Sequence, residues 1–483
     1  MDSLPSTNRP SARTDGGLNI AEAIFSRARP ESPAILAGEV AVSYRELDAR
    51  SAAVVARLRP AIGKATAPRI GLRCRDGAGY VVLALGILRA GGCLVPVAPE
   101  LTPPEQETLV SAVALDFLLT SCDGGDAGFA LETTGRSAPP AWADRFAALN
   151  PAFIRFSSGT TGRSKGVVLS HETLRARVDA ANAGLQIGRG DRVLWVLPMS
   201  HHFAVSIILY LWHGAAIIIP ASGLAGDLLS AASRHRATVI YAAPFHFGQL
   251  AGDGGRTPWP SLRLAVSTTS ALPPETGAAF DAAFGIFPAQ ALGIIEAGLP
   301  CLNVPAPRDR PGSVGRVQQG FSFALIDPEG NPAPPGGQGT LLLKGPGFFD
   351  AYVDPWQERD PAMHEGWFAT GDIARADPDG CLYLLGRSQA VINSGGRKFF
   401  PEEIEAVLLT HPGVAEARVS GRPDLALGMV PVAEIVPKNQ RSIPADLPAF
   451  CRSRLARYKI PTDWTVVGSL PRTASGKIRR TEK

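Results

Sequence analysis

Apolar and polar positions along the chain alternate between two patterns, which together predict an α/β protein. The segments 77–99, 224–244 and 274–293 each begin with a helical pattern of apolar residues and end in a short apolar run rich in β-branched or aromatic residues. Helices that alternate with strands in this way are typical of parallel sheets joined by crossover helices. No fixed-period repeat is visible in the chain, so we do not expect a solenoid.

Two further regions depart from this alternation. The most apolar stretch, 203–219, contains Ser206, His213 and Gly214 and falls short of the roughly 20 residues that a membrane helix needs. We therefore expect a buried helix leading into a buried strand, and no membrane insertion. After Gly312 the chain changes to short strands with turn residues, and 321–345 holds two β-rich runs joined by a Pro/Gly loop, which predicts an antiparallel, barrel-like portion.

The last part of the chain has the pattern of a separate small unit. Residues 401–413 predict a helix, with Pro401 at its first position and Gly413 beyond its end. Strand-like runs follow at 414–421 and 429–437, and a helical pattern at 445–456. The 483 residues exceed the roughly 250–300 at which single cores stop growing.

We expect the fold class to be α/β, in two domains. Residues 1–388 would form a large N-terminal domain of parallel or mixed sheets with crossover helices and a small β-barrel-like portion. Residues 389–483 would form a small, mobile α+β domain.

Composition narrows the class of protein. Hydrophobic residues make up 45% of the chain and charged residues 19%, as in ordinary globular proteins. The net charge of +4 is slight and no basic block stands out, so we expect no nucleic-acid partner. The six cysteines are far apart and the first residues lack the apolar core of a signal peptide, which favours a reduced, cytoplasmic protein.

One loop carries the first chemical signal. In "FIRFSSGTTGRSKGVVLSHETL" (153–174), glycines, hydroxyl residues and a lysine separate an apolar run from an amphipathic one. Glycines let the backbone approach a ligand, hydroxyls donate hydrogen bonds, and Lys165 supplies a cation. The loop fits no register of GxxxxGK[ST]. By itself it reads equally as a polyphosphate-binding loop or as a surface turn.

Three later motifs occur in a recognisable order after this loop. They are "GWFATGD" (366–372), "GRSQAVINSGGRKFFPEEIE" (386–405) and "PRTASGKIRR" (471–480). With "SSGTTGRSKG", they resemble the adenylate-forming superfamily of acyl- and aryl-CoA synthetases, peptide-synthetase adenylation domains and luciferases. Ser164 stands where that family's [ST]SG[ST]TGxPKG pattern has proline. The resemblance extends along nearly the whole chain, from Val42 onward.

The resemblance implies a role for each motif. The loop would hold the ATP phosphates, Asp372 and Arg387 would contact the ribose, and Gln389 would be the hinge of the small domain. Lys477 would reach the carboxylate and the α-phosphate during adenylation, where a cation offsets developing charge. Gly395 and Gly396 would line the thiol channel. The nucleotide-binding set implied in this way comprises Ser157, Ser158, Gly159, Thr160, Thr161, Gly162, Lys165, Thr268, Thr269, Leu292, Asp372 and Arg387.

One motif departs from the family. The family's YGxTE reads "LGIIE" (292–296) here, so that Leu292 replaces the aromatic residue over adenine and Ile295 replaces a threonine that contacts the α-phosphate. Glu296 remains and would bind Mg²⁺ through the phosphates. Losing one donor costs about 1–3 kcal/mol, so slower adenylation is expected rather than none. The adenine-side segment is also altered, reading "STTSAL" (267–272).

The region "LPMSHHFAVSIILYLWHG" (197–214) bears on the acid that is activated. It holds no carboxylate to pair with a substrate ammonium group, which favours a simple carboxylic acid over an amino acid. It resembles the LPxxH motif of CoA synthetases, whose histidine, here His201, gates the acyl and pantetheine channel. Two adjacent histidines could instead bind metal, but no third ligand appears at a suitable spacing. The implied acyl pocket consists of His202, Phe203, Phe245, Thr269, Leu292, Gly293 and Ile294.

The sequence therefore predicts an ATP- and Mg²⁺-dependent acid–thiol ligase. It would form an acyl or aryl adenylate of an aromatic or short-to-medium acid and pass the acyl group to CoA or to the phosphopantetheine of an acyl carrier protein. Two alternatives remain open. One is a standalone adenylation enzyme that loads only a carrier protein, and the other is a degenerate homologue that binds nucleotide or acyl-AMP without catalysis.

Overall fold

The computed structural model describes most of the chain. The described residues are 17–63, 65–99, 101–121, 125–135, 139–156, 165–253, 256–327, 329–387, 390, 392–394, 397–424, 427–439, 442–472 and 478–479.

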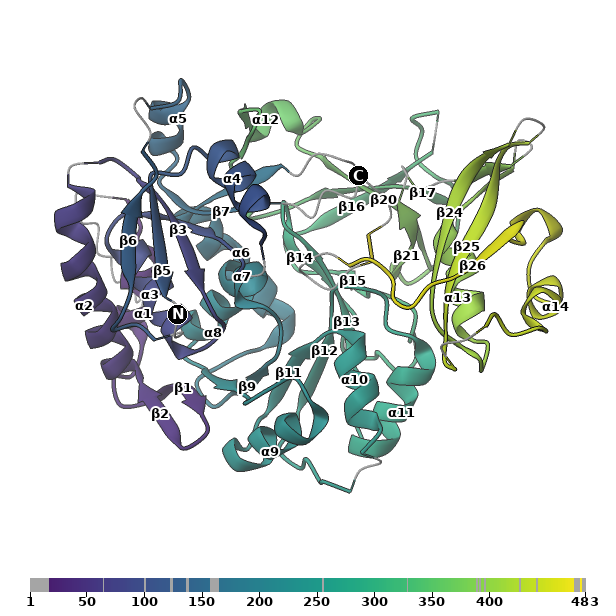
Figure 1. Cartoon of the computed structure of the whole chain (residues 1–483), viewed down its shortest axis with the longest axis horizontal. Helices are drawn as coiled ribbons and strands as arrows, with labels where there is room; N and C mark the ends of the chain where they lie inside the picture. The colour runs from purple at the N-terminus through teal and green to yellow at the C-terminus, as the bar shows by residue number, and fades with distance from the viewer. Residues whose placement is uncertain are drawn as a thin grey trace, which may run out of the picture.

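Two large mixed sheets form the N-terminal part of the molecule (Figure 1). The nine-stranded sheet has the order β15-β14-β13-β12-β11-β9-β10-β1-β2 and the eight-stranded sheet the order β19-β18-β8-β7-β4-β3-β5-β6. The strands of the first are β1 (Pro33–Ala37), β2 (Val40–Ser43), β9 (Arg192–Trp195), β10 (Ala216–Ile219), β11 (Val239–Ala242), β12 (Leu264–Ser267), β13 (Ala289–Ile294), β14 (Gly298–Leu302) and β15 (Arg316–Val317). Those of the second are β3 (Arg69–Cys74), β4 (Cys93–Pro96), β5 (Phe117–Ser121), β6 (Ala130–Thr133), β7 (Pro151–Phe156), β8 (Gly166–Ser170), β18 (Ala351–Val353) and β19 (Gln357–Glu358).

Helices cover these sheets and join their strands. They are α1 (Ile20–Arg27), α2 (Tyr44–Ile62), α3 (Ala78–Arg89), α4 (Pro103–Ala112), α5 (Ala143–Ala148), α6 (His171–Leu185), α9 (Ala225–His235), α10 (Pro244–Ala251), α11 (Pro274–Phe284) and α12 (Arg359–Ala362). Local chemistry sets several helix starts. Ser43 and Glu46 form a capping box at α2, and the Ser170 side chain accepts from the Thr173 N–H at α6.

The main core lies between the two large sheets. Helix α3 is buried from Gly79 to Leu88, as expected of a helix that is apolar all round. Its side chains share one cluster with Phe153 and Val167 of the eight-stranded sheet and with Val193 and Ile217 of the nine-stranded sheet. A second cluster includes residues of α9, α10 and α11 together with the nine-stranded sheet, and a third covers part of the eight-stranded sheet. The predicted alternation of helices and strands is confirmed at 77–99, 224–244 and 274–293.

The apolar stretch 203–219 is a buried helix followed by a buried strand, as predicted. Helix α7 (Met199–His202) directly precedes this stretch. The stretch itself consists of a π-helical turn at Phe203–Ile207 and α8 (Ile208–Trp212), followed by β10. The π turn was not foreseen, and such turns often occur at functional sites. In the described part of the chain, none of the helices is long and apolar enough to cross a membrane.

Two smaller sheets complete the fold. The expected antiparallel portion is a four-stranded sheet of β16 (Ser322–Ile326), β17 (Gln338–Lys344), β20 (Phe368–Ala376) and β21 (Leu382–Arg387). In Figure 1 it lies between the large sheets and the yellow C-terminal unit. That unit contains β22 (Ile392–Ser394), β23 (Arg397–Phe399), α13 (Pro401–Leu409), β24 (Val414–Asp424), β25 (Gly428–Pro437), α14 (Leu447–Arg452), a 3-10 helix (Arg457–Lys459) and β26 (Asp463–Val466).

The C-terminal unit has a hydrophobic core of its own. Ile404 and Leu408 of α13 pack with Val419 and Ile435 of its sheet. Pro401 stands in the first turn of α13, as predicted, and this helix ends at Leu409, before Gly413. The helix expected over 445–456 is shorter, since α14 covers only Leu447–Arg452. The α/β class with a large N-terminal part and a small α+β C-terminal part is confirmed.

Candidate active site

Three neighbouring strands place polar side chains on the inner face of the eight-stranded sheet. Arg155 of β7 pairs with Val167 of β8, and Val167 pairs with Tyr352 of β18. Directly paired residues of antiparallel strands lie on the same face, so Arg155 and Tyr352 share the face of the main core. Lys165, just before β8, holds its Nζ 4.7 Å from the centre of the Tyr352 ring. Residues far apart in sequence thus meet where the predicted phosphate loop ends.

Glu296 joins this group from the nine-stranded sheet. The Tyr352 hydroxyl donates to Glu296 Oε1 over 3.4 Å. Burial, the largest effect, raises the pKa of the Glu296 carboxyl, and Arg177 and the tyrosine hydroxyl oppose the shift. A single carboxylate that shares Mg²⁺ with substrate phosphates is a common magnesium site. The Glu296 carboxylate, which accepts from the same tyrosine whose ring lies under Lys165, suits that arrangement.

Arg177 of α6 fixes the backbone around Glu296. Its guanidinium donates from Nε to the Gly347 carbonyl over 2.5 Å and from Nη2 to the Glu296 carbonyl over 2.7 Å. Gly347 has φ +68°, and a Cβ there would lie 2.7 Å from Arg177 Cγ. Burial lowers the pKa of Arg177 to about 10, so it remains charged at neutral pH. Arg177 therefore connects α6 by hydrogen bonds to the loop at Gly347 and to the turn at Glu296.

Asp372 and Arg387 meet across the antiparallel pair β20 and β21, where they are register partners. Arg387 Nε lies 2.8 Å from Asp372 Oδ1, and Arg387 Nη1 donates to the Thr370 carbonyl over 3.0 Å. The aspartate side chain is 8% exposed and the arginine 43%. A buried carboxylate held by a more exposed arginine is chemically suited to accept hydrogen bonds from a diol.

The two histidines of "LPMSHH" lie at the end of α7. Burial first, and Arg155 second, lower the pKa of His201 to about 4, so its imidazole is neutral at pH 7. Its Nε2 atom is buried without a hydrogen-bond partner among the described residues. His202 is buried against Trp195, with ring centres 5.8 Å apart. His201 therefore presents a neutral ring near the charged group formed around Arg155.

The remaining predicted pocket residues come from several elements. Thr268 is buried at the end of β12, and a Cβ on Gly293 would lie 3.8 Å from its hydroxyl oxygen. The next residue, Thr269, has a left-handed backbone conformation, with φ +77°. Leu292 is buried and Ile294 partly buried. These five positions lie at the carboxyl ends of β12 and β13, where ligands of open α/β sheets bind.

Two predicted pocket aromatics differ in exposure. Phe203 has no exposed surface and packs 5.8 Å from the Tyr80 ring. Phe245 on α10 is 68% exposed, with its ring 5.6 Å from His246. Their role in an acyl pocket stays a prediction.

Several predicted residues lie outside the described part of the chain. They are Ser157, Ser158, Gly159, Thr160, Thr161 and Gly162 of the phosphate loop, Gln389, Gly395, Gly396 and Lys477. Their assignments stay predictions. Among the described members, Asp372 and Arg387 are in direct contact, and Lys165 and Glu296 each contact Tyr352.

Sequence reasoning missed three residues of this region, Arg155, Arg177 and Tyr352. Arg155 carried a signal, because it is a charge on an otherwise apolar strand directly before the phosphate loop. Tyr352 and Arg177 gave none, since their contacts depend on strand and helix packing between segments more than a hundred residues apart.

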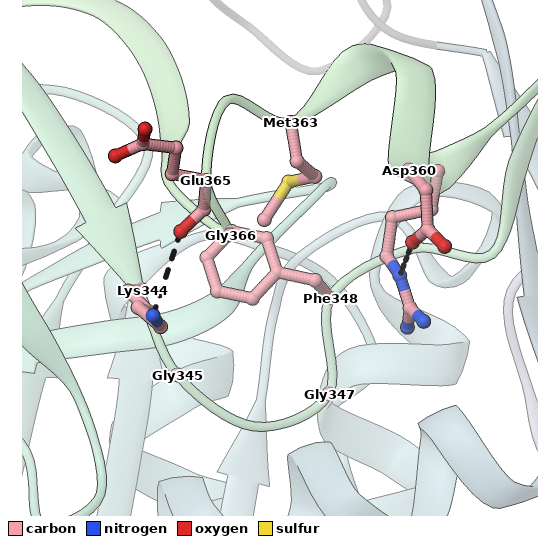
Figure 2. A pocket seen from close by; sticks show the side chains of 9 residues that line it. Lys344, Gly345, Gly347, Phe348, Asp360, Met363, Glu365 and Gly366 are labelled. Atoms are coloured by element: carbon pink, nitrogen blue, oxygen red, sulfur yellow. Dashed lines mark hydrogen bonds and ion pairs between the residues drawn. The ribbon is translucent and has the colours of Figure 1, made fainter.

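The structure also contains two cavities of about 370 Å³, one of which is bordered by Gly347, the residue whose carbonyl accepts from Arg177. Figure 2 shows the one between the end of β17 and the turn at 363–366, lined in part by Lys344, Phe348 and Met363. Lys344 Nζ donates to the Glu365 carbonyl over 3.5 Å, and Arg359 pairs with Asp360 over 3.4 Å. The other is lined in part by Arg27, Arg189 and Trp212. No predicted site residue is among the described residues that line either cavity.

Comparison with known proteins agrees with this geometry. Residues 23–353 match the model of the family described as AMP-binding enzyme, and residues 403–477 match the AMP-binding enzyme C-terminal domain. A sulfoacetate–CoA ligase of Cupriavidus necator is 36% identical over 337 residues, which are 68% of this chain and 66% of that relative. An oxalate–CoA ligase of Arabidopsis thaliana is 30% identical over 437 residues, 83% of this chain and 85% of that relative.

A solved structure gives the same picture. The o-succinylbenzoate CoA synthetase of Bacillus subtilis, in complex with its acyl-adenylate intermediate, superposes with a TM-score of 0.83. The two chains are 25% identical, and the match covers 96% of this chain and 97% of that one.

The fold and the site together define a nucleotide-binding α/β protein of the adenylate-forming class. The chain belongs to the AMP-binding enzyme family.

Proposed function

We propose that the protein is an AMP-forming acid–thiol ligase. A carboxylate would attack the α-phosphate of ATP to give an acyl adenylate and pyrophosphate, and a pantetheine thiol would then displace AMP. The observation that carries the proposal is the meeting of Lys165, Tyr352 and Glu296 at the end of the phosphate loop. The proposal is supported by relatives whose names are those of CoA ligases.

Each described residue has a part that follows from its chemistry. Lys165 would neutralise phosphate charge, and Asp372, held by Arg387, would accept hydrogen bonds from the ribose hydroxyls. Glu296 would hold Mg²⁺, which when bound offsets the charge of the phosphates. The neutral His201 would border the acid without adding charge of its own.

The C-terminal part would complete the site. We propose that residues 389–483 form a mobile lid hinged at Gln389, with Lys477 acting in the first step and Gly395 and Gly396 facing the thiol in the second. Splitting one difficult displacement into two steps through an activated phosphoester requires two arrangements of groups around the same acid. The C-terminal unit has a hydrophobic core of its own, which supports its assignment as a separate domain.

The names of the relatives suggest the chemical class of the acid substrate. We propose a small carboxylic acid, aromatic or short-chain, and CoA as the acceptor. Sulfoacetate, oxalate and o-succinylbenzoate, the acids named for three related proteins, each carry two acidic groups. A carrier-protein thiol is the alternative acceptor.

Acid-dependent pyrophosphate release tests the proposal. The protein with ATP and Mg²⁺ should release pyrophosphate with at least one member of a panel of alkyl and aryl acids, and thioester should form on addition of CoA. Lys477→Ala should abolish acid-dependent release, whereas Lys438→Ala, a substitution at an exposed lysine, should not. Release that is unaffected by Lys477→Ala would contradict the assignment of that lysine.

The panel also separates the alternatives. Thioester formed with a phosphopantetheinylated carrier protein but not with CoA would identify a carrier-loading enzyme. A protein that binds ATP but releases no pyrophosphate with any acid would be the degenerate homologue suggested by Leu292 and Ile295.

A further inference from the structure

Arg155 is a charged residue in an apolar setting. On the same face of β7 it is preceded by Phe153, which is 1% exposed, and its pairing partner Val167 is fully buried. The residue as a whole is partly buried, and its guanidinium Nε is buried. The position is the last but one of the strand, directly before the phosphate loop. A strand of this kind would ordinarily carry an apolar residue there.

In the part of the chain that the structure describes, no hydrogen bond or ion pair accounts for the Arg155 guanidinium. Among the described residues its Nε has no hydrogen bond. The Glu296 carboxylate raises the pKa of Arg155 by its charge but forms no ion pair with it. The loop that follows, "SSGTTGRS", contains no acidic residue. Burial lowers the pKa of Arg155 to about 10, so the group is still a cation at neutral pH. A buried guanidinium nitrogen is normally hydrogen-bonded, and an anion bound from solution would supply that partner.

His201 indicates where such an anion would lie. Its Nε2 is also buried without a partner, and Arg155 acts on its pKa. Two nitrogens, one on a cation and one on a neutral ring, therefore have no hydrogen bond among the described residues. Arg155 lies directly before the phosphate loop and His201 lies on α7, so both border the candidate site. Lys165, on the phosphate side, is placed instead over the Tyr352 ring. The Arg155 cation is thus additional to the one that the phosphate loop already supplies.

The space behind the histidines is filled, which limits the length of the acid. The His202 ring packs against Trp195, and Trp195 packs against Tyr210 and Tyr241 with ring centres about 6 Å apart. The Phe203 ring packs against the Tyr80 ring, with ring centres 5.8 Å apart. An acid bound beside His201 would have little depth for a long chain.

We propose that Arg155 binds the second acidic group of a short acid that carries two, a dicarboxylic or sulfocarboxylic acid, and so selects the substrate. The inference rests on the proposed function, since it assigns the second charge of the acid that is to be adenylated. The first carboxylate stays free for the α-phosphate, while the guanidinium pairs with the other group in a charge-assisted, bidentate geometry.

Matched pairs of acids test this assignment. Sulfoacetate is compared with methylsulfonylacetate, and succinate with butyrate, so that each pair differs mainly in one negative charge. Initial rates of pyrophosphate release are measured for the full-length wild-type chain, Arg155→Met and Arg155→Lys. Arg175→Met is the control, because Arg175 is a largely exposed arginine that pairs within α6. Titration calorimetry with sulfoacetate and succinate gives a readout that needs no turnover.

The wild-type protein should favour the doubly charged acid of at least one pair. Arg155→Met should lower kcat/KM for that acid by about tenfold or more, the usual effect of a lost charge-assisted hydrogen bond. The KM for ATP and the rate with the singly charged partner should change little, and Arg155→Lys should restore part of the selectivity. The melting temperature of Arg155→Met should stay equal or rise, because an unpaired buried charge is removed.

Three results would overturn the inference. One is a wild-type protein that prefers the singly charged acid of both pairs. Another is a uniform loss with all acids together with a raised KM for ATP, which would place the guanidinium on the phosphates. The third is a lower melting temperature of Arg155→Met with unchanged selectivity, which would make Arg155 structural. If no acid gives pyrophosphate, the proposed function fails, whereas calorimetry still decides whether Arg155 binds a doubly charged acid.

Discussion

At the scale of single residues, burial lowers the pKa of several histidines, and His171 shows the consequence for stability. It is 3% exposed at the start of α6, its Nδ1 accepts from the Ile20 N–H over 3.1 Å, and burial lowers its pKa to about 4. In the unfolded chain the pKa returns to about 6.5. Between these values the unfolded state binds a proton that the folded state does not, so the free energy of unfolding falls as pH falls from 6.5 to 4.

We expect this histidine to account for about 3 kcal/mol of the loss across that interval, from a pKa difference of two to three units. His171→Asn keeps a side-chain acceptor and removes the titration, so it should flatten the pH dependence of urea unfolding between pH 6.5 and 4. His364→Asn, at an exposed position, should leave the slope unchanged. An equal slope in wild-type and His171→Asn proteins would show that His171 does not titrate in this way.

Single residues also show how far sequence could define the site. Four residues lie in short sequence motifs, namely Asp372, Arg387, Lys165 and Glu296. Each motif resembles one that binds a part of ATP, so the sequence could predict that these residues belong to one site. Tyr352 could not be predicted, because it reaches Lys165 and Glu296 only through the pairing of β18 with β8, which joins segments about 180 residues apart. Local pattern carries no information about such pairing.

At the scale of elements, α6 stabilises the site through one buried side chain. Arg177 binds the carbonyls of Gly347 and Glu296, and the Phe349 N–H also donates to the Glu296 carbonyl over 2.8 Å. Arg177→Met should leave two carbonyls without their charged donor. We expect a loss of about 3 kcal/mol in the free energy of unfolding, together with slower pyrophosphate release, because Glu296 would lose its fixed backbone.

Arg175→Met is the matched control for this prediction. Arg175 lies on the same helix but is 57% exposed, in an ion pair with Asp179 at 3.8 Å. Exposed pairs of this kind contribute under about 1 kcal/mol. Urea unfolding and initial rates of both variants give the comparison, and equal effects of the two substitutions would exclude a special role for Arg177.

Helices and strands were predicted best where the pattern of apolar residues extended over many positions. The alternating helices and strands and the small C-terminal unit follow from apolar spacing and from Pro and Gly at element ends. The π turn at Phe203–Ile207 did not, because an apolar run has the same composition whether its hydrogen bonds close α or π turns. The short α14 shows the same limit at its end. Ser453 and Leu455 still donate to carbonyls four residues earlier, but the Arg454 N–H bonds the Cys451 carbonyl three residues earlier, and the regular helix stops at Arg452.

At the scale of the whole molecule, the cores divide near the predicted boundary between residues 388 and 389. The described residues of the main core extend to Leu382, and those of the C-terminal core begin at Ile392. Contact between the two parts includes Gly386 of β21, where a Cβ would lie 2.7 Å from Phe400 and from Glu402. Parts of a chain that have separate hydrophobic cores should unfold as separate units.

We therefore expect a chain of residues 1–388 to fold, with a cooperative calorimetric transition within a few degrees of the corresponding transition of the full-length protein. It should still bind ATP, because Lys165, Glu296, Asp372 and Arg387 all lie within it. It should release no pyrophosphate with any acid, since Lys477 is absent. A truncated chain that aggregates or melts without cooperativity would show that the last 95 residues are part of one core, and retained pyrophosphate release would remove the C-terminal unit from the first step.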